Sequence, residues 1–102
     1  MTEYVTIATT AEVKDGERII VEVNGHYVGL FNVGNRYYAI EDRCTHDDGP
    51  LADGELTGTV IECPRHGATF DIVTGKALTL PAITPVPRYA VRVQGDEIQI
   101  LI

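Results

Sequence analysis

The sequence predicts an all-β fold, and three observations support this prediction. Apolar and polar residues alternate over short segments, most clearly at 89–93 and 98–102. Turn residues separate the segments, and Asn24-Gly25 is the strongest two-residue hairpin signal because both residues tolerate positive φ. No segment shows sustained helical periodicity. We therefore expect roughly eight or nine short strands.

The first half of the chain contains four expected strands, each rich in β-branched and aromatic residues. They are Tyr4–Ala8, Arg18–Val23, His26–Val33 and Tyr37–Ile40. The turn pairs between them are Asp15-Gly16, Asn24-Gly25 and Gly34-Asn35. Because side chains alternate along a strand, we expect one of Tyr37 and Tyr38 to point inward and the other outward.

The second half continues with shorter strands and ends in a hairpin. The expected segments are Glu55–Leu56, Thr59–Glu62, Ala68–Ile72, Tyr89–Val93 and Ile98–Ile102, the last two joined by Gly95-Asp96. Between 80 and 87, three prolines fall within seven residues, which forbids regular ladder pairing. That stretch is an expected loop, and its simplest interpretation is a connection between strands.

Composition limits the classes of function. A chain of 102 residues forms one domain, 1–102, and 44% hydrophobic with 23% charged residues is ordinary for a globular protein. The net charge of −7 argues against nucleic acid as a partner. No apolar run could span a bilayer, and Met1–Val13 lacks the pattern of a signal peptide, so we expect a cytoplasmic protein without membrane contact.

Two short motifs carry the chemistry. Cys44-Thr45-His46 and Cys63-Pro64-Arg65-His66 contain both cysteines and two of the three histidines. Thiolates and imidazoles suit either zinc or an iron–sulfur centre. In a Cys2His2 zinc finger the cysteines come together and the histidines together, whereas here each motif supplies one of each. Two such loops could clasp a dinuclear cluster, and a zinc-stabilised β-module is the alternative.

These motifs, with the following Gly67-Ala68-Thr69-Phe70-Asp71, resemble those of Rieske-type ferredoxins, particularly the ferredoxin components of bacterial ring-hydroxylating dioxygenase systems. The resemblance implies one Rieske [2Fe–2S] cluster, with Cys44 and Cys63 on one iron and His46 and His66 on the other. It also implies stacked antiparallel sheets, a cluster-binding subdomain at about 42–81, and a proline-rich loop near the cluster.

By the same resemblance the chain is an electron carrier and not itself an enzyme. It would pass single electrons from a flavin-dependent reductase to a terminal oxygenase, both of them transient partners of a monomer. The alternative within the family is a permanently bound small subunit, like that of assimilatory nitrite reductase.

The chain differs in two respects from the members of the Rieske family that have a high reduction potential. Those members join their cluster loops by a disulfide, but Thr45 and Arg65 occupy the corresponding positions here, so other contacts must hold the loops. Ala68 and Phe70 replace a serine and a tyrosine that donate hydrogen bonds to cluster sulfurs. Because such bonds favour the reduced cluster, we expect a low potential, about −150 mV.

Two further groups of residues have open interpretations. His26 follows a hairpin turn without a neighbouring cysteine, so we expect a surface histidine and not a fifth ligand. Asp42, Asp47 and Asp48 surround the first motif. They are either ordinary solvated carboxylates or an acidic rim that steers a basic partner to the cluster.

Overall fold

The protein is a stack of antiparallel sheets. The computed structural model describes residues 3–45, 49–65, 67–80 and 82–102, which form ten strands and no helix, so the all-β prediction is confirmed. No helix in those ranges is long and apolar enough to cross a membrane. The strands are β1 (Tyr4–Thr9), β2 (Arg18–Val23), β3 (His26–Val33), β4 (Arg36–Glu41), β5 (Glu55–Thr57), β6 (Val60–Glu62), β7 (Thr69–Asp71), β8 (Arg88–Tyr89), β9 (Val91–Gln94) and β10 (Glu97–Leu101).

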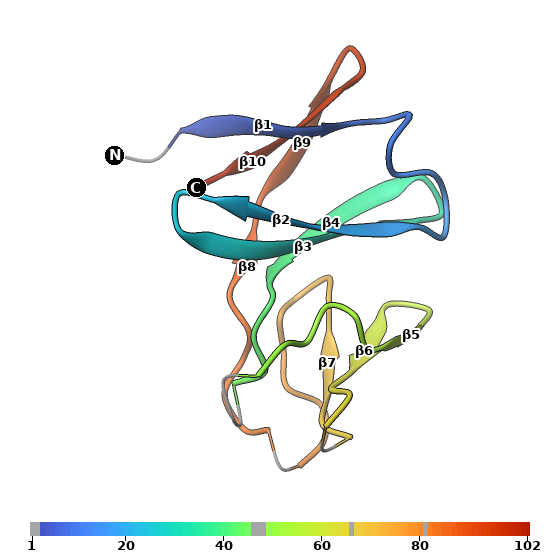
Figure 1. The fold of residues 1–102 in the computed structure, drawn as a ribbon. Coiled ribbons are helices and arrows are strands. Elements are labelled where there is room, and N and C mark those ends of the chain that lie inside the picture. The colour runs from blue at the N-terminus through green and yellow to red at the C-terminus, as the bar shows by residue number, and fades with distance from the viewer. Residues whose placement is uncertain (1–2, 46–48, 66, 81) are drawn as a thin grey trace.

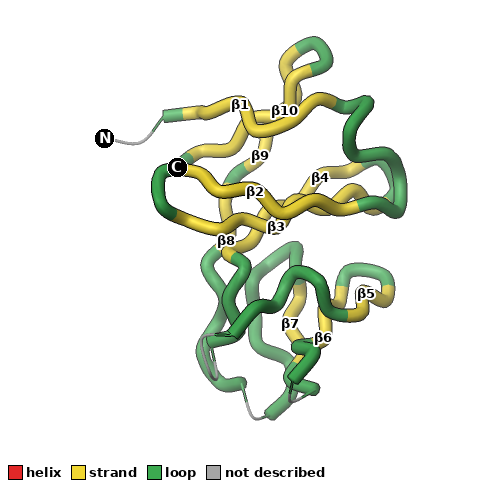
Figure 2. The backbone as a smooth tube through the Cα atoms, viewed as in Figure 1, coloured by secondary structure: helices red, strands yellow, loops and turns green. Residues whose placement is uncertain are grey.

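The strands form three sheets in distinct parts of the molecule. Their orders are β1-β10-β9, β2-β3-β4-β8 and β5-β6-β7, with antiparallel pairing throughout. Figure 1 shows the first two sheets stacked in the upper part and the third sheet below them. The lower part consists mainly of loops (Figure 2). The described residues of both predicted motifs, Cys44 and Cys63 among them, belong to this loop-rich part.

The four-stranded sheet is the middle layer, and both of its faces are covered. Leu30 and Ala39 are paired across β3 and β4 and pack in one buried cluster with residues of β10. Their neighbours Phe31 and Ile40 point to the other face, into a second cluster that contains residues of β6 and β7. Because side chains alternate along each strand, one sheet can fill two cores.

Because both faces of the four-stranded sheet are covered, the burial of Tyr37 and Tyr38 differs from the prediction. Tyr37 and Tyr38 do point to opposite faces, since Tyr37 packs against the first cluster and Tyr38 against the second. Both are half-buried, however, so the prediction that one faces outward is wrong. Alternation predicts which face a side chain occupies, but not whether another layer covers that face.

The predicted strand Tyr89–Val93 is also divided. Tyr89 ends β8, which pairs with β4 of the middle sheet, whereas Val91 begins β9, which pairs with β10 of the top sheet. Ala90 lies between them, and its carbonyl oxygen accepts a hydrogen bond from the Leu101 N–H at 2.9 Å. The chain thus passes from the four-stranded sheet to the sheet of β1, β10 and β9 at Ala90. The carbonyl group of that residue still has a hydrogen-bond partner.

The hairpin between β2 and β3 matches its prediction, including the bounds of both strands. Asn24 has φ of 50° and Gly25 has φ of 83°, the positive pair that a two-residue hairpin of this type requires.

Candidate metal centre

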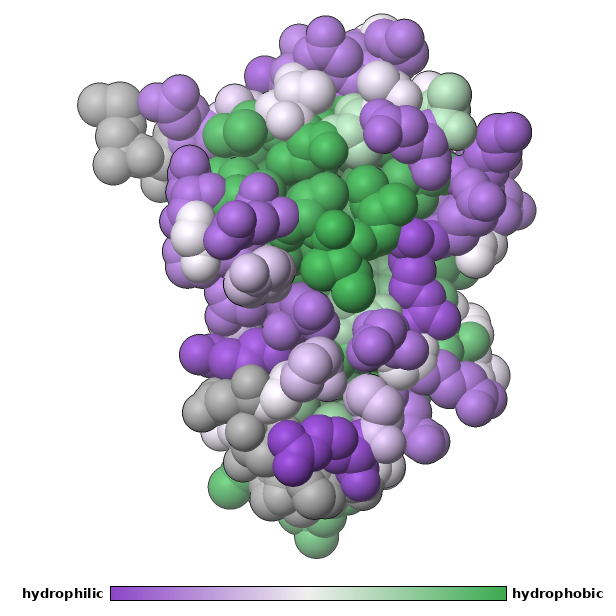
Figure 3. All heavy atoms as spheres, viewed as in Figure 1, coloured by the Kyte–Doolittle hydropathy of each residue, from purple (hydrophilic) through white to green (hydrophobic). Residues whose placement is uncertain are grey.

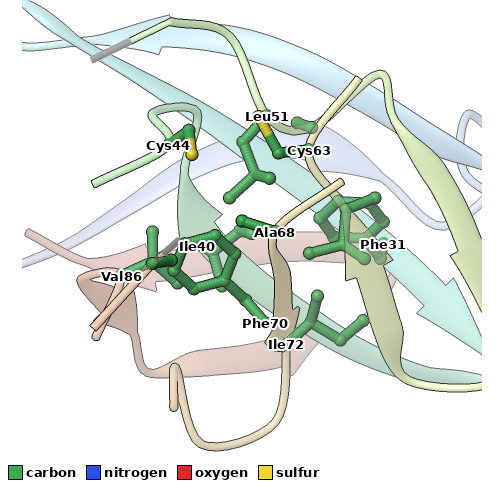
Figure 4. Close-up of a cluster of buried hydrophobic side chains, with 12 residues drawn as sticks. Phe31, Ile40, Cys44, Leu51, Cys63, Ala68, Phe70, Ile72 and Val86 are labelled. Atoms are coloured by element: carbon green, nitrogen blue, oxygen red, sulfur yellow. The ribbon is translucent and has the colours of Figure 1, made fainter. Parts of the chain in front are cut away.

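The two cysteines lie in one buried cluster although 18 residues separate them in the sequence. Cys44 follows β4 and is 0% exposed, and Cys63 follows β6 and is 1% exposed. No disulfide joins them. Figure 4 shows both sulfur atoms at the same end of the hydrophobic cluster, beside Leu51. The fold therefore brings together the two thiols that the motifs predicted as ligands.

The loop that contains Cys44 is closed by hydrogen bonds of its own. The Cys44 N–H donates to the Gly49 carbonyl oxygen at 2.7 Å. One oxygen of the Asp42 carboxylate accepts from the Leu51 N–H at 2.8 Å and from the Ala52 N–H at 2.6 Å. Asp42 is thus a brace across the loop, a role that neither sequence interpretation of this carboxylate included.

Removing the Asp42 brace should destabilise the protein. Asp42→Ala leaves the N–H groups of two fully buried residues without their acceptor. At about 1–3 kcal/mol for each of the two unsatisfied groups, we expect the free energy of unfolding in urea to fall by about 2–6 kcal/mol. Asp53→Ala, at an exposed position of the same loop region, is the control and should change it by under about 0.5 kcal/mol. Equal stability of the two variants would contradict the brace.

The loop that contains Cys63 makes a tighter turn. The Cys63 N–H donates to the Ala68 carbonyl oxygen at 2.7 Å, and the Gly67 N–H donates back to the Cys63 carbonyl oxygen at 3.1 Å. Gly67 has φ of 73°, which a residue with a side chain would adopt only with strain. These bonds fix the backbone immediately around the thiol.

The loop that follows Cys44 is attached to the middle sheet and passes close to β6. Arg18 on β2 extends its guanidinium across the boundary, and Nη1 donates to the Ala52 carbonyl oxygen at 2.8 Å and to the Gly54 carbonyl oxygen. A Cβ added at Gly54 would clash with the Glu62 carbonyl oxygen, so the backbone of the first loop packs directly against that of β6. These long-range contacts hold the first loop between β2 and β6, the strand that precedes Cys63.

The proline-rich stretch packs beside the cysteines, as the family resemblance implied, and is more than a connection between strands. Ala82 and Val86 are buried in the cluster that contains both cysteines. The Thr45 hydroxyl donates to the Thr84 carbonyl oxygen at 2.6 Å, which joins this loop to the Cys44 loop. The proline-rich stretch is therefore anchored both to the core around the thiols and to the residue that follows Cys44.

A polar network lies where the Cys44 loop leaves β4. The Glu41 carboxylate accepts from the Tyr89 hydroxyl at 3.1 Å, lies 2.8 Å from His26 Nδ1, and lies 3.6 Å from Arg43 Nη2. Burial raises the pKa of Glu41, but the hydrogen bonds from His26 and Tyr89 and the charge of Arg43 outweigh it, so the pKa is lowered. His26 is exposed, which confirms the predicted surface histidine.

The same network predicts a loss of stability at high pH. Burial, together with the Glu41 charge and hydrogen bond, raises the pKa of Tyr89 from 10.0 to about 12. Between these values the unfolded chain loses the proton that the folded chain keeps, so the Tyr89 contribution is complete below pH 10 and declines toward pH 12. Urea unfolding should show a steeper decline across this window for wild type than for Tyr89→Phe. Parallel profiles would contradict this.

The predicted site residues have two outcomes. The structure brings Cys44 and Cys63 together, as expected of ligands of one iron. His46 and His66 lie outside the described residues, as do Asp47 and Asp48.

Four contributors to the site were not identified from the sequence: Arg18, Glu41, the Asp42 brace and the Thr45–Thr84 contact. An aspartate two positions before a predicted ligand was the one available local signal.

Comparisons with known proteins agree with this geometry. The family profile described as Rieske [2Fe-2S] domain matches residues 3–90. The 3-phenylpropionate/cinnamic acid dioxygenase ferredoxin subunit of Escherichia coli (strain K12) is 43% identical over 89 residues, 86% of this chain and 83% of that protein. The ferredoxin of carbazole 1,9a-dioxygenase from Nocardioides aromaticivorans IC177 has a TM-score of 0.89 at 35% identity, covering 95% of both chains. A chain from the complex of reduced oxygenase and oxidized ferredoxin in carbazole 1,9a-dioxygenase has a TM-score of 0.88 at 32% identity, covering 95% of this chain and 91% of that chain.

The described residues suit an iron–sulfur cluster. Two thiols meet at one end of an apolar core, on loops whose backbones are fixed by internal hydrogen bonds. Thiolates are the ligands that such clusters take from proteins, and an apolar surround excludes water from them. Family match, fold and donor chemistry therefore agree: the chain belongs to the Rieske [2Fe–2S] family and binds one Rieske-type cluster.

Proposed function

We propose that this protein is an electron-transfer component, not a catalyst, and carries single electrons from a flavin-dependent reductase to a terminal oxygenase. The relatives named above are ferredoxins of dioxygenase systems, and one of them was solved in complex with its oxygenase. When bound, a Rieske cluster takes up and releases one electron. The observation that carries the proposal is the pair of buried thiols at one end of a shared core, on two loops of the lower part.

The proposed ligand set is Cys44 and Cys63 on one iron and His46 and His66 on the other. Cys44 and Cys63 are held at fixed backbone positions by bonds to Gly49 and Ala68. The motif spacing places each histidine two or three residues after its cysteine, on the same loop. We further propose that the cluster-binding subdomain extends over about 42–81, within the single domain 1–102.

The side chains around the thiols support a low potential. Ala68 and Phe70 are both 0% exposed and lie in the hydrophobic core that contains both cysteines. Neither side chain has a hydrogen-bond donor. We propose that Ala68→Ser adds a hydroxyl hydrogen bond to a cluster sulfur and so favours the reduced state. A bond of about 1 kcal/mol would raise the one-electron potential by about 40 mV.

Protein-film voltammetry checks the Ala68→Ser prediction. The matched control is Ala77→Ser, which adds the same hydroxyl to an alanine packed against the same core. The potential of the control should stay within about 10 mV of wild type, because its hydroxyl is placed outside the proposed ligand loops. An unchanged or lower potential in Ala68→Ser would contradict the proposed effect.

Reconstitution tests the proposed function. The purified protein is combined with NADH, the flavin reductase and the terminal oxygenase of the 3-phenylpropionate/cinnamic acid system, and the dihydroxylated product is measured. Product should form only when all three proteins are present, and Cys63→Ser should give none. If the cluster-loaded protein supports no product and is not oxidised by the oxygenase, the proposal is wrong.

The proposal also includes a free, cytoplasmic monomer that meets each partner transiently. Small redox interfaces are usually weak, which suits a carrier that must leave one partner before meeting the next. Sedimentation of the cluster-loaded protein should give the mass of one 11.1 kDa chain plus its cluster. Stable co-purification with a large redox enzyme would favour a permanent small subunit instead.

A further inference from the structure

Two large apolar side chains stand out on the surface of the lower part. Leu80 is 78% exposed and Ile83 is 80% exposed, whereas Tyr27, the next among the large hydrophobic residues that the structure describes, is 58% exposed. Pro85 beside them is also exposed. We call Leu80, Ile83 and Pro85 the apolar lip. Figure 3 shows hydrophobic atoms at the lower end of the molecule, away from the stacked sheets.

The lip is directly attached to the proposed cluster loops. The carbonyl oxygen of Thr84, the residue between Ile83 and Pro85 of the lip, accepts the hydrogen bond from the Thr45 hydroxyl, and Thr45 is adjacent to Cys44. Ala82 and Val86 bury the intervening backbone in the core that contains both thiols. The fold therefore fixes this loop from inside while leaving its two largest apolar side chains in water.

The position of these exposed apolar side chains, beside the loop that contains Cys44, indicates an interaction surface. Single exposed apolar residues are ordinary on a protein surface, but apolar groups gathered beside a functional site mark interaction surfaces. Electron transfer becomes steeply slower with distance, so an acceptor must cover the end of the molecule that holds the thiols. Ile83 and Pro85 flank Thr84, which is hydrogen-bonded to the residue after Cys44, so the lip lies beside the Cys44 loop.

Of the three carboxylates of the expected acidic rim, the structure describes Asp42, and this one has another role. The Asp42 carboxylate is engaged inside its own loop, where it accepts two backbone hydrogen bonds. The exposed groups of the lip carry no charge. Contacts made by uncharged apolar side chains depend little on ionic strength, whereas contacts made by surface charges weaken as salt rises.

We infer that the apolar lip is a docking surface for the terminal oxygenase and fits an uncharged apolar patch on it; this rests on the proposed function. A solved relative at 32% identity forms a complex with an oxygenase, which makes the oxygenase the occupant. Burial of the apolar surface of the lip adds affinity for the oxygenase. Charged residues elsewhere on the protein influence how the two proteins approach each other.

The test compares two double variants. Leu80→Ser with Ile83→Ser removes the lip, and Ile20→Ser with Val93→Ser makes the same chemical change at exposed positions of β2 and β9. Stopped-flow absorption follows electron transfer from each reduced protein to the oxygenase of the 3-phenylpropionate/cinnamic acid system, at low and high salt. Oxidation by ferricyanide and the reduction potential report whether the cluster itself is intact.

We expect the lip variant to lose about tenfold in its second-order rate constant at both salt concentrations, with unchanged potential and ferricyanide rate. The control variant should match wild type, and Leu80→Met with Ile83→Val should restore transfer. A wild-type rate in the lip variant, a loss confined to low salt, or a loss only in reduction by the flavin reductase would each overturn the inference. If wild type reduces ferricyanide but never the oxygenase, the proposed function itself fails.

Discussion

Cys44→Ser and Cys63→Ser should each abolish cluster binding, the largest effect expected of any substitution considered. Both thiols are at most 1% exposed, and the core around them offers iron no substitute sulfur, because the chain has two cysteines in all. A buried serine hydroxyl without a partner also costs about 1–3 kcal/mol. Purified variants should lack the visible absorption of the cluster and contain under about a tenth of the iron per chain found in wild type.

Thr45→Val is the matched control for the cysteine variants. It changes a residue adjacent to Cys44 and removes the hydrogen bond to Thr84, but it leaves both thiols in place. Iron content and acid-labile sulfide should match wild type in this variant. Full occupancy in both cysteine variants would show that the two thiols are not the iron ligands.

The second large effect is on stability. Phe70 lies at the centre of β7, is 0% exposed and packs in the core that contains both cysteines. Phe70→Ala removes a ring from the layer between the middle sheet and the cluster loops. Large-to-small changes of this kind cost about 3–5 kcal/mol, and we expect that loss in the free energy of unfolding measured in urea.

The control for Phe70→Ala is Val93→Ala. Val93 is 44% exposed on β9, in the top sheet, so its truncation should cost under about 1 kcal/mol. Because iron binds only the folded chain, Phe70→Ala should also release iron at a lower urea concentration than the control does. A loss under about 1 kcal/mol in Phe70→Ala would show that the lower core contributes little to stability.

Local patterns in the sequence predicted much of the fold. The strands Arg18–Val23 and His26–Val33 were predicted with their observed bounds, because alternation and the Asn24-Gly25 turn act over a few residues. The division at Ala90 was missed because it depends on pairing with β4 on one side and β10 on the other. Likewise, the burial of Tyr38 depends on a layer supplied by residues far along the chain.

The same distinction applies to the site. The cysteines were identified because ligands cluster in short motifs with characteristic spacing. The bond from Arg18 to Ala52 spans 34 positions and that from Thr45 to Thr84 spans 39, so no local pattern indicates either. Asp42 was noticed for its charge. Its role as a brace depends on the loop bringing Leu51 and Ala52, nine and ten positions later, back to its carboxylate.

The most direct test of the account is pulsed EPR of the dithionite-reduced protein at low temperature. The account predicts one unpaired electron per chain with the anisotropic spectrum of a Rieske cluster, coupled to two imidazole nitrogens that are lost one at a time in His46→Cys and His66→Cys. A colourless, EPR-silent protein containing zinc, or a cluster signal without nitrogen coupling, would contradict it.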